Sequence, residues 1–130
     1  NNNLVEIFHV GKVIIKDCVD IGALNTIAGG TIDSTYIDSY NKFDDHIHVA
    51  HNGYFGKNNI ICAAVTFGGS VRIGENNFFG LNSTIRNFLS IGNNNFIGQG
   101  SNVVKDIHND KMVYGNPAKW YFCILNNNKN

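Results

Sequence analysis

Apolar residues recur every six positions through most of this chain. Twelve successive positions at this spacing are Ile, Val or Phe, although only 43% of all residues are apolar. The positions are Ile37, Phe43, Val49, Phe55, Ile61, Phe67, Ile73, Phe79, Ile85, Ile91, Ile97 and Val103. A six-residue period fits neither an α-helix nor a hairpin of ordinary strands, but it fits one short strand followed by one corner. The pattern therefore predicts a coiled β structure with the twelve side chains inside.

A second, threefold longer spacing indicates that three such hexapeptide units make one coil. Gly56-Lys57-Asn58-Asn59 recurs as Gly74-Glu75-Asn76-Asn77 and again as Gly92-Asn93-Asn94-Asn95. Stacked triangular coils bring these segments to one edge, at a corner where Gly and Asn tolerate a positive φ. We expect an all-β, single-stranded parallel β-helix.

An earlier stretch has the same period in another phase, with Ile15, Ile21 and Ile27. The phases differ by four residues, which places a small insertion between Ala28 and Ile37. About five coils result. We expect residues 1–107 to form the β-helix and residues 108–130 a C-terminal loop and a short apolar tail. Lys111 to Lys119 are expected as the loop, and Trp120 to Leu125 as the apolar segment.

Composition excludes several classes of protein. Formal net charge is zero and the basic residues are scattered, so no basic stripe marks a nucleic-acid binder. No run approaches the roughly 20 apolar residues of a membrane span. No signal-peptide pattern opens the chain, so a cytoplasmic location is expected. Three widely spaced cysteines, with no CxxC motif, predict free thiols and neither a zinc site nor a disulfide framework.

The repeat and the motifs together resemble the hexapeptide-repeat acyltransferases. IGALNTIAGGTI (residues 21–32), KFDDHIHVAHN (42–52) and the later GGS (68–70) resemble the UDP-3-O-acylglucosamine N-acyltransferases of lipid A synthesis. STIRN (83–87), IGQGSNVVKDI (97–107) and VYGNPAK (113–119) look more like N-acetyltransferases of nucleotide-linked amino sugars. The resemblance implies left-handed coils, which the repeat alone does not, and a homotrimer with sites between subunits. Solenoid faces that need neighbours also favour self-association.

The chain departs from the lipid A enzymes in three respects. It shows no counterpart of their N-terminal uridine-binding domain or of their long C-terminal helical region. Their second active-site histidine falls at Phe88. We therefore expect the smaller acyl group, acetyl from acetyl-CoA, transferred to the amino group of a nucleotide-linked sugar in envelope glycan synthesis. The alternative is a lipid A-type N-acyltransferase that uses acyl carrier protein as its donor. O-acetylation stays open.

Acyl transfer to an amine needs a base, an oxyanion donor and two substrates held together. The resemblance makes His51 of the AHN motif the base. Asn52 takes the place where related enzymes often carry a glutamate that orients the base. Gly69, three hexapeptides after His51, is implied as the backbone donor to the oxyanion.

The remaining candidates bind substrates. Asn87, a further three hexapeptides along the chain, shares the column of His51 and Gly69 and is expected to touch the acyl donor. Arg86 and Lys119 are candidates for pairing with CoA phosphates. His46 and His48 are expected to line the sugar-nucleotide cleft.

Two other classes of function stay open at this stage. Within the pattern His46-x-His48-x-x-His51, the spacing of His46 and His51 resembles that of two zinc ligands of γ-class carbonic anhydrases. That family's upstream Arg-x-Asp pattern is missing, so we expect no metal. A non-catalytic β-helix that only binds or scaffolds is the other alternative, against which the AHN and GNPAK motifs argue.

Overall fold

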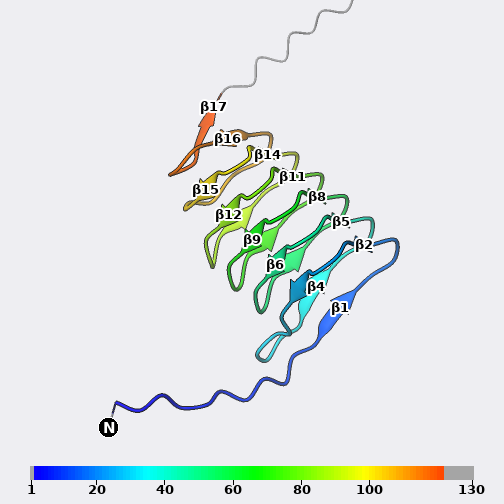
Figure 1. Ribbon diagram of the computed structural model, residues 1–130, viewed down its shortest axis with the longest axis vertical. Coiled ribbons are helices and arrows are strands. Elements are labelled where there is room, and N and C mark those ends of the chain that lie inside the picture. The colour runs from blue at the N-terminus through cyan, green and yellow to red at the C-terminus, as the bar shows by residue number, and fades with distance from the viewer. Residues whose placement is uncertain (1, 122–130) are drawn as a thin grey trace, which may run out of the picture.

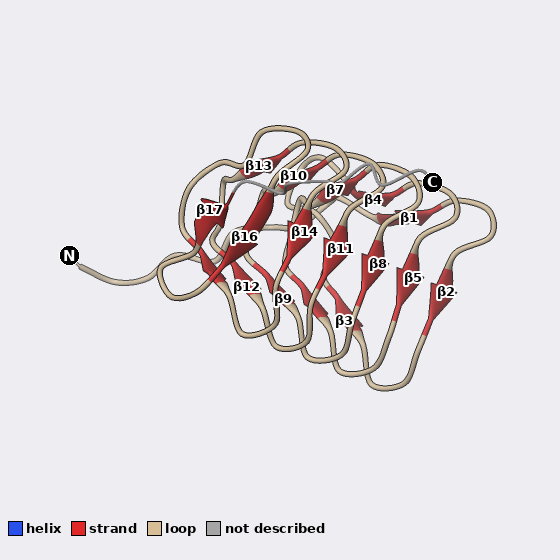
Figure 2. Ribbon diagram, turned by 90° about the horizontal axis from the view of Figure 1, so that it is seen from above, coloured by secondary structure: helices blue, strands red, loops and turns tan. Residues whose placement is uncertain are grey.

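Residues 2–121 are described by the computed structural model, and they contain strands but no helix. The chain winds through short strands that stack into three sheets along the long axis of the molecule (Figures 1 and 2). Sheet A has the order β1-β4-β7-β10-β13, sheet B the order β17-β16-β14-β11-β8-β5-β2, and sheet C the order β15-β12-β9-β6-β3. All pairs are parallel except β16–β17. This is the parallel β-helix that the repeat predicts.

From β1 to β15 the strands follow one another in the repeating order A, B, C, whereas β16 and β17 both belong to sheet B. Their bounds are β1 Val13–Ile15, β2 Asp20–Ile21, β3 Thr26–Ile27, β4 Thr35–Ile37, β5 Lys42–Phe43, β6 His48–Val49, β7 Tyr54–Phe55, β8 Ile60–Ile61, β9 Thr66–Phe67, β10 Arg72–Ile73, β11 Phe78–Phe79, β12 Thr84–Ile85, β13 Ser90–Ile91, β14 Phe96–Ile97, β15 Asn102–Val103, β16 Met112–Tyr114 and β17 Lys119–Tyr121.

The pairing register gives the length of each coil. Val13 pairs with Thr35, whereas a step of three hexapeptides would end at Thr31, so the first coil contains the predicted insertion. From β4 to β15 the partners lie three hexapeptides apart, as in Tyr54 and Arg72. The last step is shorter by two residues, because Phe96 pairs with Met112. Five complete coils and part of a sixth result, one part-coil more than the sequence predicts.

The twelve periodic side chains form the core. Every one of them is buried, from Ile37 to Val103. Four aromatic rings make edge-to-face contacts along the core, at centroid distances of 5.6, 4.9 and 5.0 Å from Phe43 through Phe55 and Phe67 to Phe79. Each such contact adds about 0.5–1.5 kcal/mol beyond the area buried. Because these side chains pack inside the coils, they fix the positions of the corners between the strands.

The corner between sheets A and B carries the repeated Gly-x-Asn-Asn segments, and we call it the asparagine edge (residues 56–59, 74–77 and 92–95). The third residue of each segment has a positive φ, with values of 59°, 58° and 58° at Asn58, Asn76 and Asn94, as predicted. The fourth residue, again an asparagine, is buried, and it continues a ladder that starts at Asn41. In each step a side-chain oxygen accepts the backbone N–H of the next asparagine at 2.9–3.0 Å.

The C-terminal part differs from the expected loop. Met112–Tyr114 forms strand β16, parallel to β14, so sheet B continues beyond the predicted end of the β-helix. Lys119–Tyr121 then folds back antiparallel to β16 as β17. Sequence reasoning missed β16 because the coil before it is two residues short, which shifts Val113 out of the six-residue phase. Phe122 to Leu125, the rest of the predicted apolar segment, lie outside the described residues. Within residues 2–121 no helix suited to crossing a membrane is present.

Candidate active site

The predicted base lies where the chain turns from sheet C into sheet A. We call this corner the C–A edge; it comprises residues 50–53, 68–71 and 86–89, one segment from each of three successive coils. The segments are joined by backbone hydrogen bonds from Ser70 N to His51 O (2.8 Å) and from Phe88 N to Gly69 O (2.9 Å). His51, Gly69 and Asn87 therefore occupy one column, as their spacing of three hexapeptides predicts.

His51 is exposed, and its ring is oriented by the next residue. Its Nδ1 lies 3.0 Å from Oδ1 of Asn52. An amide oxygen only accepts hydrogen bonds, so this contact assigns the proton of a neutral imidazole to Nδ1. Nε2 then keeps its lone pair, which is the form that a general base requires.

Asn52 is itself held by the four-residue insertion of the first coil. Its Oδ1 accepts hydrogen bonds from the backbone N and the hydroxyl of Thr31, at 3.2 and 3.0 Å, and its Nδ2 donates to Asp33 O at 3.1 Å. Its backbone N–H donates to the Thr35 hydroxyl at 2.9 Å. These contacts fix which end of the amide faces His51. No sequence signal pointed to Thr31 and Thr35, because they act across a coil boundary of irregular length.

Gly69 lies directly against the His51 ring. A Cβ added at Gly69 would stand 2.7 Å from both Cε1 and Nε2 of that imidazole, so only glycine leaves room for the ring here. The backbone hydrogen bonds that join successive coils use the N–H groups of Gly68 and Ser70, the residues on either side of Gly69. Within residues 2–121 no hydrogen-bond acceptor is assigned to the Gly69 N–H. A free backbone donor and an imidazole ring thus lie side by side.

The other predicted residues are spread around the prism. Arg86 and Asn87 are exposed on the C–A edge, one coil beyond Gly69. His48 points outward from sheet C, where its Nδ1 is 2.7 Å from the Thr26 hydroxyl. His46 occupies the opposite end of β6, at the corner between sheets B and C, with a φ of 58°. Lys119 lies in β17 on sheet B.

The histidine triplet therefore does not converge within one chain, since His46 and His51 lie at the two ends of the same strand. Among residues 2–121, no three His, Cys, Asp or Glu side chains are grouped so as to hold a metal ion. Cys62 offers no activated nucleophile either. Burial raises the pKa of its thiol and the Asp44 carboxylate raises it further, so the thiol stays protonated near neutral pH.

The chain is similar in sequence to curated proteins that share one name. The chain is 51% identical over 113 residues to a UDP-3-O-acylglucosamine N-acyltransferase of Christiangramia forsetii, which covers 87% of this chain and 33% of that protein. It is 46% identical over 110 residues to one from Legionella pneumophila, covering 85% of this chain and 32% of that protein. The chain thus spans about a third of the length of these curated relatives. No family model matches the sequence.

Solved structures give the same picture. LpxA from Acinetobacter baumannii superposes with a TM-score of 0.72 at 32% identity, over 79% of this chain and 43% of that one. An Arabidopsis UDP-N-acetylglucosamine acyltransferase superposes with a TM-score of 0.83 at 27% identity, over 85% and 39%. The acetyltransferase domain of PglB from Neisseria gonorrhoeae (TM-score 0.57, 21% identity, 84% and 54% covered) shares the fold. These likenesses confirm the left-handed β-helix expected from the resemblance.

Proposed function

Since the chain belongs to the hexapeptide-repeat, left-handed β-helix acyltransferases, we propose that it transfers an acyl group from a thioester to the amino group of a UDP-linked acylglucosamine. One observation carries the proposal: the His51 ring, with Nδ1 engaged by Asn52, lies on a glycine whose N–H is unused. Base and oxyanion donor are the two groups that aminolysis of a thioester requires.

The proposed reaction uses these two groups in sequence. Nε2 of His51 takes a proton from the amine as the amine nitrogen attacks the thioester carbonyl carbon. The carbonyl oxygen becomes an oxyanion, to which the Gly69 N–H donates a hydrogen bond. When the tetrahedral intermediate collapses, the carbon–sulfur bond breaks and the proton on Nε2 passes to the departing sulfur. The products are an amide and a free thiol, and His51 returns to its neutral form.

Asn52 has a positioning role in this scheme. A glutamate at this place would also stabilise the imidazolium by its charge, whereas an amide supplies orientation only. The contacts from Thr31 and Asp33 make that orientation rigid. We therefore expect removal of the Thr31 hydroxyl to lower activity less than removal of His51.

The comparisons favour the acyl-carrier-protein alternative over the acetyl-CoA reaction expected from the sequence. The curated relatives at 51% and 46% identity are both named N-acyltransferases of UDP-3-O-acylglucosamine. The acetyltransferase similarity, at 21% identity, supports the fold alone. We accordingly propose a long-chain acyl thioester of acyl carrier protein as donor, contacted by Arg86 and Asn87 on the C–A edge.

We further propose that the active form is a homotrimer. His46 and Lys119 lie away from the C–A edge of their own chain, so they reach a substrate there only from a neighbouring copy. We propose that His48, on the adjoining sheet C, lines the sugar-nucleotide cleft. In this arrangement each site is formed at a subunit boundary.

A thiol-release assay tests the donor and the acceptor together. The protein is incubated with UDP-3-O-acylglucosamine and either long-chain acyl carrier protein or acetyl-CoA. We expect acceptor-dependent release from the acyl carrier protein and little from acetyl-CoA. Release from acetyl-CoA with other nucleotide-linked amino sugars would instead establish the smaller acyl group. Absence of release from every donor would reject the proposed reaction.

A further inference from the structure

Phe88 is the one exposed large apolar side chain on the C–A edge, whose segments 50–53, 68–71 and 86–89 all lie within the described residues. Its side chain is 72% exposed. It shares a corner column with Asn52 and Ser70, and like them it has a left-handed backbone, with a φ of 63°. The residue before it, Asn87, is exposed, and the residue after it, Leu89, is buried. The Phe88 ring is therefore presented to whatever binds along this edge.

Phe88 lies next to the residue that is proposed to bind the oxyanion. Its backbone N–H donates to Gly69 O at 2.9 Å, just as Ser70 N donates to His51 O at 2.8 Å. Adjacent coils are about 4.8 Å apart. An acyl carbonyl that accepts the Gly69 N–H therefore has Phe88 on the coil after it and His51 on the coil before it. The acyl chain attached to that carbonyl starts within reach of the Phe88 ring.

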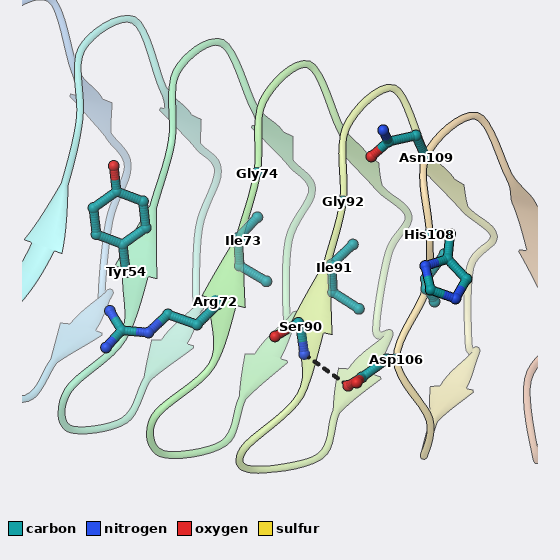
Figure 3. Close-up of a pocket in the computed structure, with 11 residues that line it drawn as sticks. Tyr54, Arg72, Ile73, Gly74, Ser90, Ile91, Gly92, Asp106, His108 and Asn109 are labelled. Atoms are coloured by element: carbon teal, nitrogen blue, oxygen red, sulfur yellow. Dashed lines mark hydrogen bonds between the residues drawn. The ribbon is translucent and has the colours of Figure 1, made fainter.

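The neighbouring surface offers an acyl chain little apolar contact. Figure 3 shows the outer face of sheet A, where strand β13 begins two residues after Phe88 and a hollow of about 440 Å³ opens beside Ser90. The exposed side chains around this hollow include the charged Arg72 and Asp106. Its aromatic ring, that of Tyr54, is occupied by the Arg72 guanidinium, whose carbon lies 5.8 Å from the ring centroid. An acyl chain at the C–A edge therefore finds its apolar contact at Phe88.

We propose that the Phe88 ring contacts the first methylene groups of the donor's acyl chain and so selects longer acyl groups over acetyl. The inference rests on the proposed function, which supplies the donor. A phenyl ring transfers no proton, so Phe88 acts by apolar contact alone. Each methylene group that the ring removes from water strengthens binding about fourfold. An acetyl group has no methylene group, and carbons beyond the ring gain nothing further from it.

Transfer to UDP-3-O-acylglucosamine from acyl carrier protein charged with acetyl, hexanoyl or dodecanoyl groups tests the proposal. The kcat/KM for each donor is measured with the wild type, Phe88→Asn, Phe88→Leu and Tyr40→Asn. Tyr40 is the matched control, because it is aromatic, 55% exposed and left-handed with a φ of 65°. It lies in the corner column of Asn58, between sheets A and B, away from the C–A edge.

The expected result is a loss that depends on the acyl group. Phe88→Asn should lower kcat/KM about tenfold for the hexanoyl and dodecanoyl donors alike, and about twofold or less for the acetyl donor. Phe88→Leu should keep most of the preference, because leucine is also apolar. Tyr40→Asn should match the wild type with all three donors. Because Phe88 is exposed and asparagine tolerates its φ, the variant is expected to fold.

Other outcomes overturn the proposal. An equal loss with all three donors contradicts it, and altered assembly in size-exclusion chromatography would then place the ring at a contact between copies. No loss with any donor contradicts it as well. A wild type that transfers none of the three groups rejects the proposed function, and the ring is then tested by calorimetry with acetyl- and dodecanoyl-phosphopantetheine. Tighter binding of the dodecanoyl thioester that is lost in Phe88→Asn keeps the inference, whereas equal binding of the two, or binding of neither, overturns it.

Discussion

The asparagine edge and the C–A edge are corners of the same prism, built from the same six-residue unit. At the asparagine edge each coil repeats the one below, and Asn59, Asn77 and Asn95 continue a buried ladder of hydrogen bonds. At the C–A edge no residue repeats: His51, Gly69 and Asn87 succeed one another in the same column. The asparagine edge is uniform because every coil needs the same hydrogen-bonded corner. The proposed reaction would explain the variation at the C–A edge, since it requires different groups at defined places.

The positive-φ positions show the same contrast. At the asparagine edge the positive φ falls on Asn58, Asn76 and Asn94, which tolerate the left-handed conformation. At the C–A edge it falls on Asn52, Ser70 and Phe88, with φ values of 61°, 59° and 63°. Phe88 is both bulky and 72% exposed, so the corner accepts a strained, apolar residue at the surface.

The largest effect on the C–A edge is expected from Gly69→Ala. The new methyl group would overlap the His51 ring, which is the mobile end of a side chain, so the ring moves and the fold persists. We expect the rate of acyl transfer to fall about 10²-fold, because the displaced ring no longer holds Nε2 beside the Gly69 N–H, which alanine keeps. Steady-state kinetics and a thermal melt on the same sample measure both quantities.

Gly68→Ala is the matched control for that variant. Its methyl group would stand 2.8 Å from the Cα of Asn87 and closer still to the Asn87 backbone N, neither of which can move aside easily. Gly68→Ala should therefore lower the melting temperature, whereas Gly69→Ala should not. Equal destabilisation by the two substitutions would show that Gly69 acts as a corner residue and nothing more.

On the asparagine edge, Asn77→Leu is expected to affect stability instead of activity. It removes the donors to Asn59 Oδ1 and Gly92 O and the acceptor of the Asn95 N–H, which leaves buried polar groups unpaired. The free energy of unfolding should fall by about 3 kcal/mol in urea denaturation. The exposed neighbour Asn76, replaced by Ala, should cost only about 1–2 kcal/mol because of its positive φ. A smaller loss for Asn77→Leu than for Asn76→Ala would contradict the ladder's role.

The smallest expected effect is a gain in stability. Phe88→Asn replaces an exposed ring in a left-handed conformation by a residue that tolerates it, so the melting temperature should rise by about 3 °C. A fall in melting temperature would mean that the ring packs against a neighbouring copy. The C–A edge would then differ from the asparagine edge in lying at a contact between subunits.

The two edges were predictable from the sequence by different routes. The periodic residues from Ile37 to Val103, the corner asparagines and the four-residue insertion followed from spacing alone, since each coil imposes the same packing on the next. His51 and Gly69 were proposed only through a family resemblance, because residues that depart from the repeat have no internal copy. The hydrogen bonds from Thr31 to Asn52 and strand β16 were not predicted. Each depends on contacts between coils at the long first step or the short last step, which break the period.

The most direct test of the C–A edge as the reactive edge is the kcat/KM of His51→Ala for transfer from acyl carrier protein to UDP-3-O-acylglucosamine, with His9→Ala as the control histidine outside the coils. Because His51 is exposed, its loss should leave the thermal melt unchanged. We expect a decrease of about 10²-fold or more for His51→Ala and none for His9→Ala. A His51→Ala variant that retains the wild-type kcat/KM would contradict the assignment of His51 as the base.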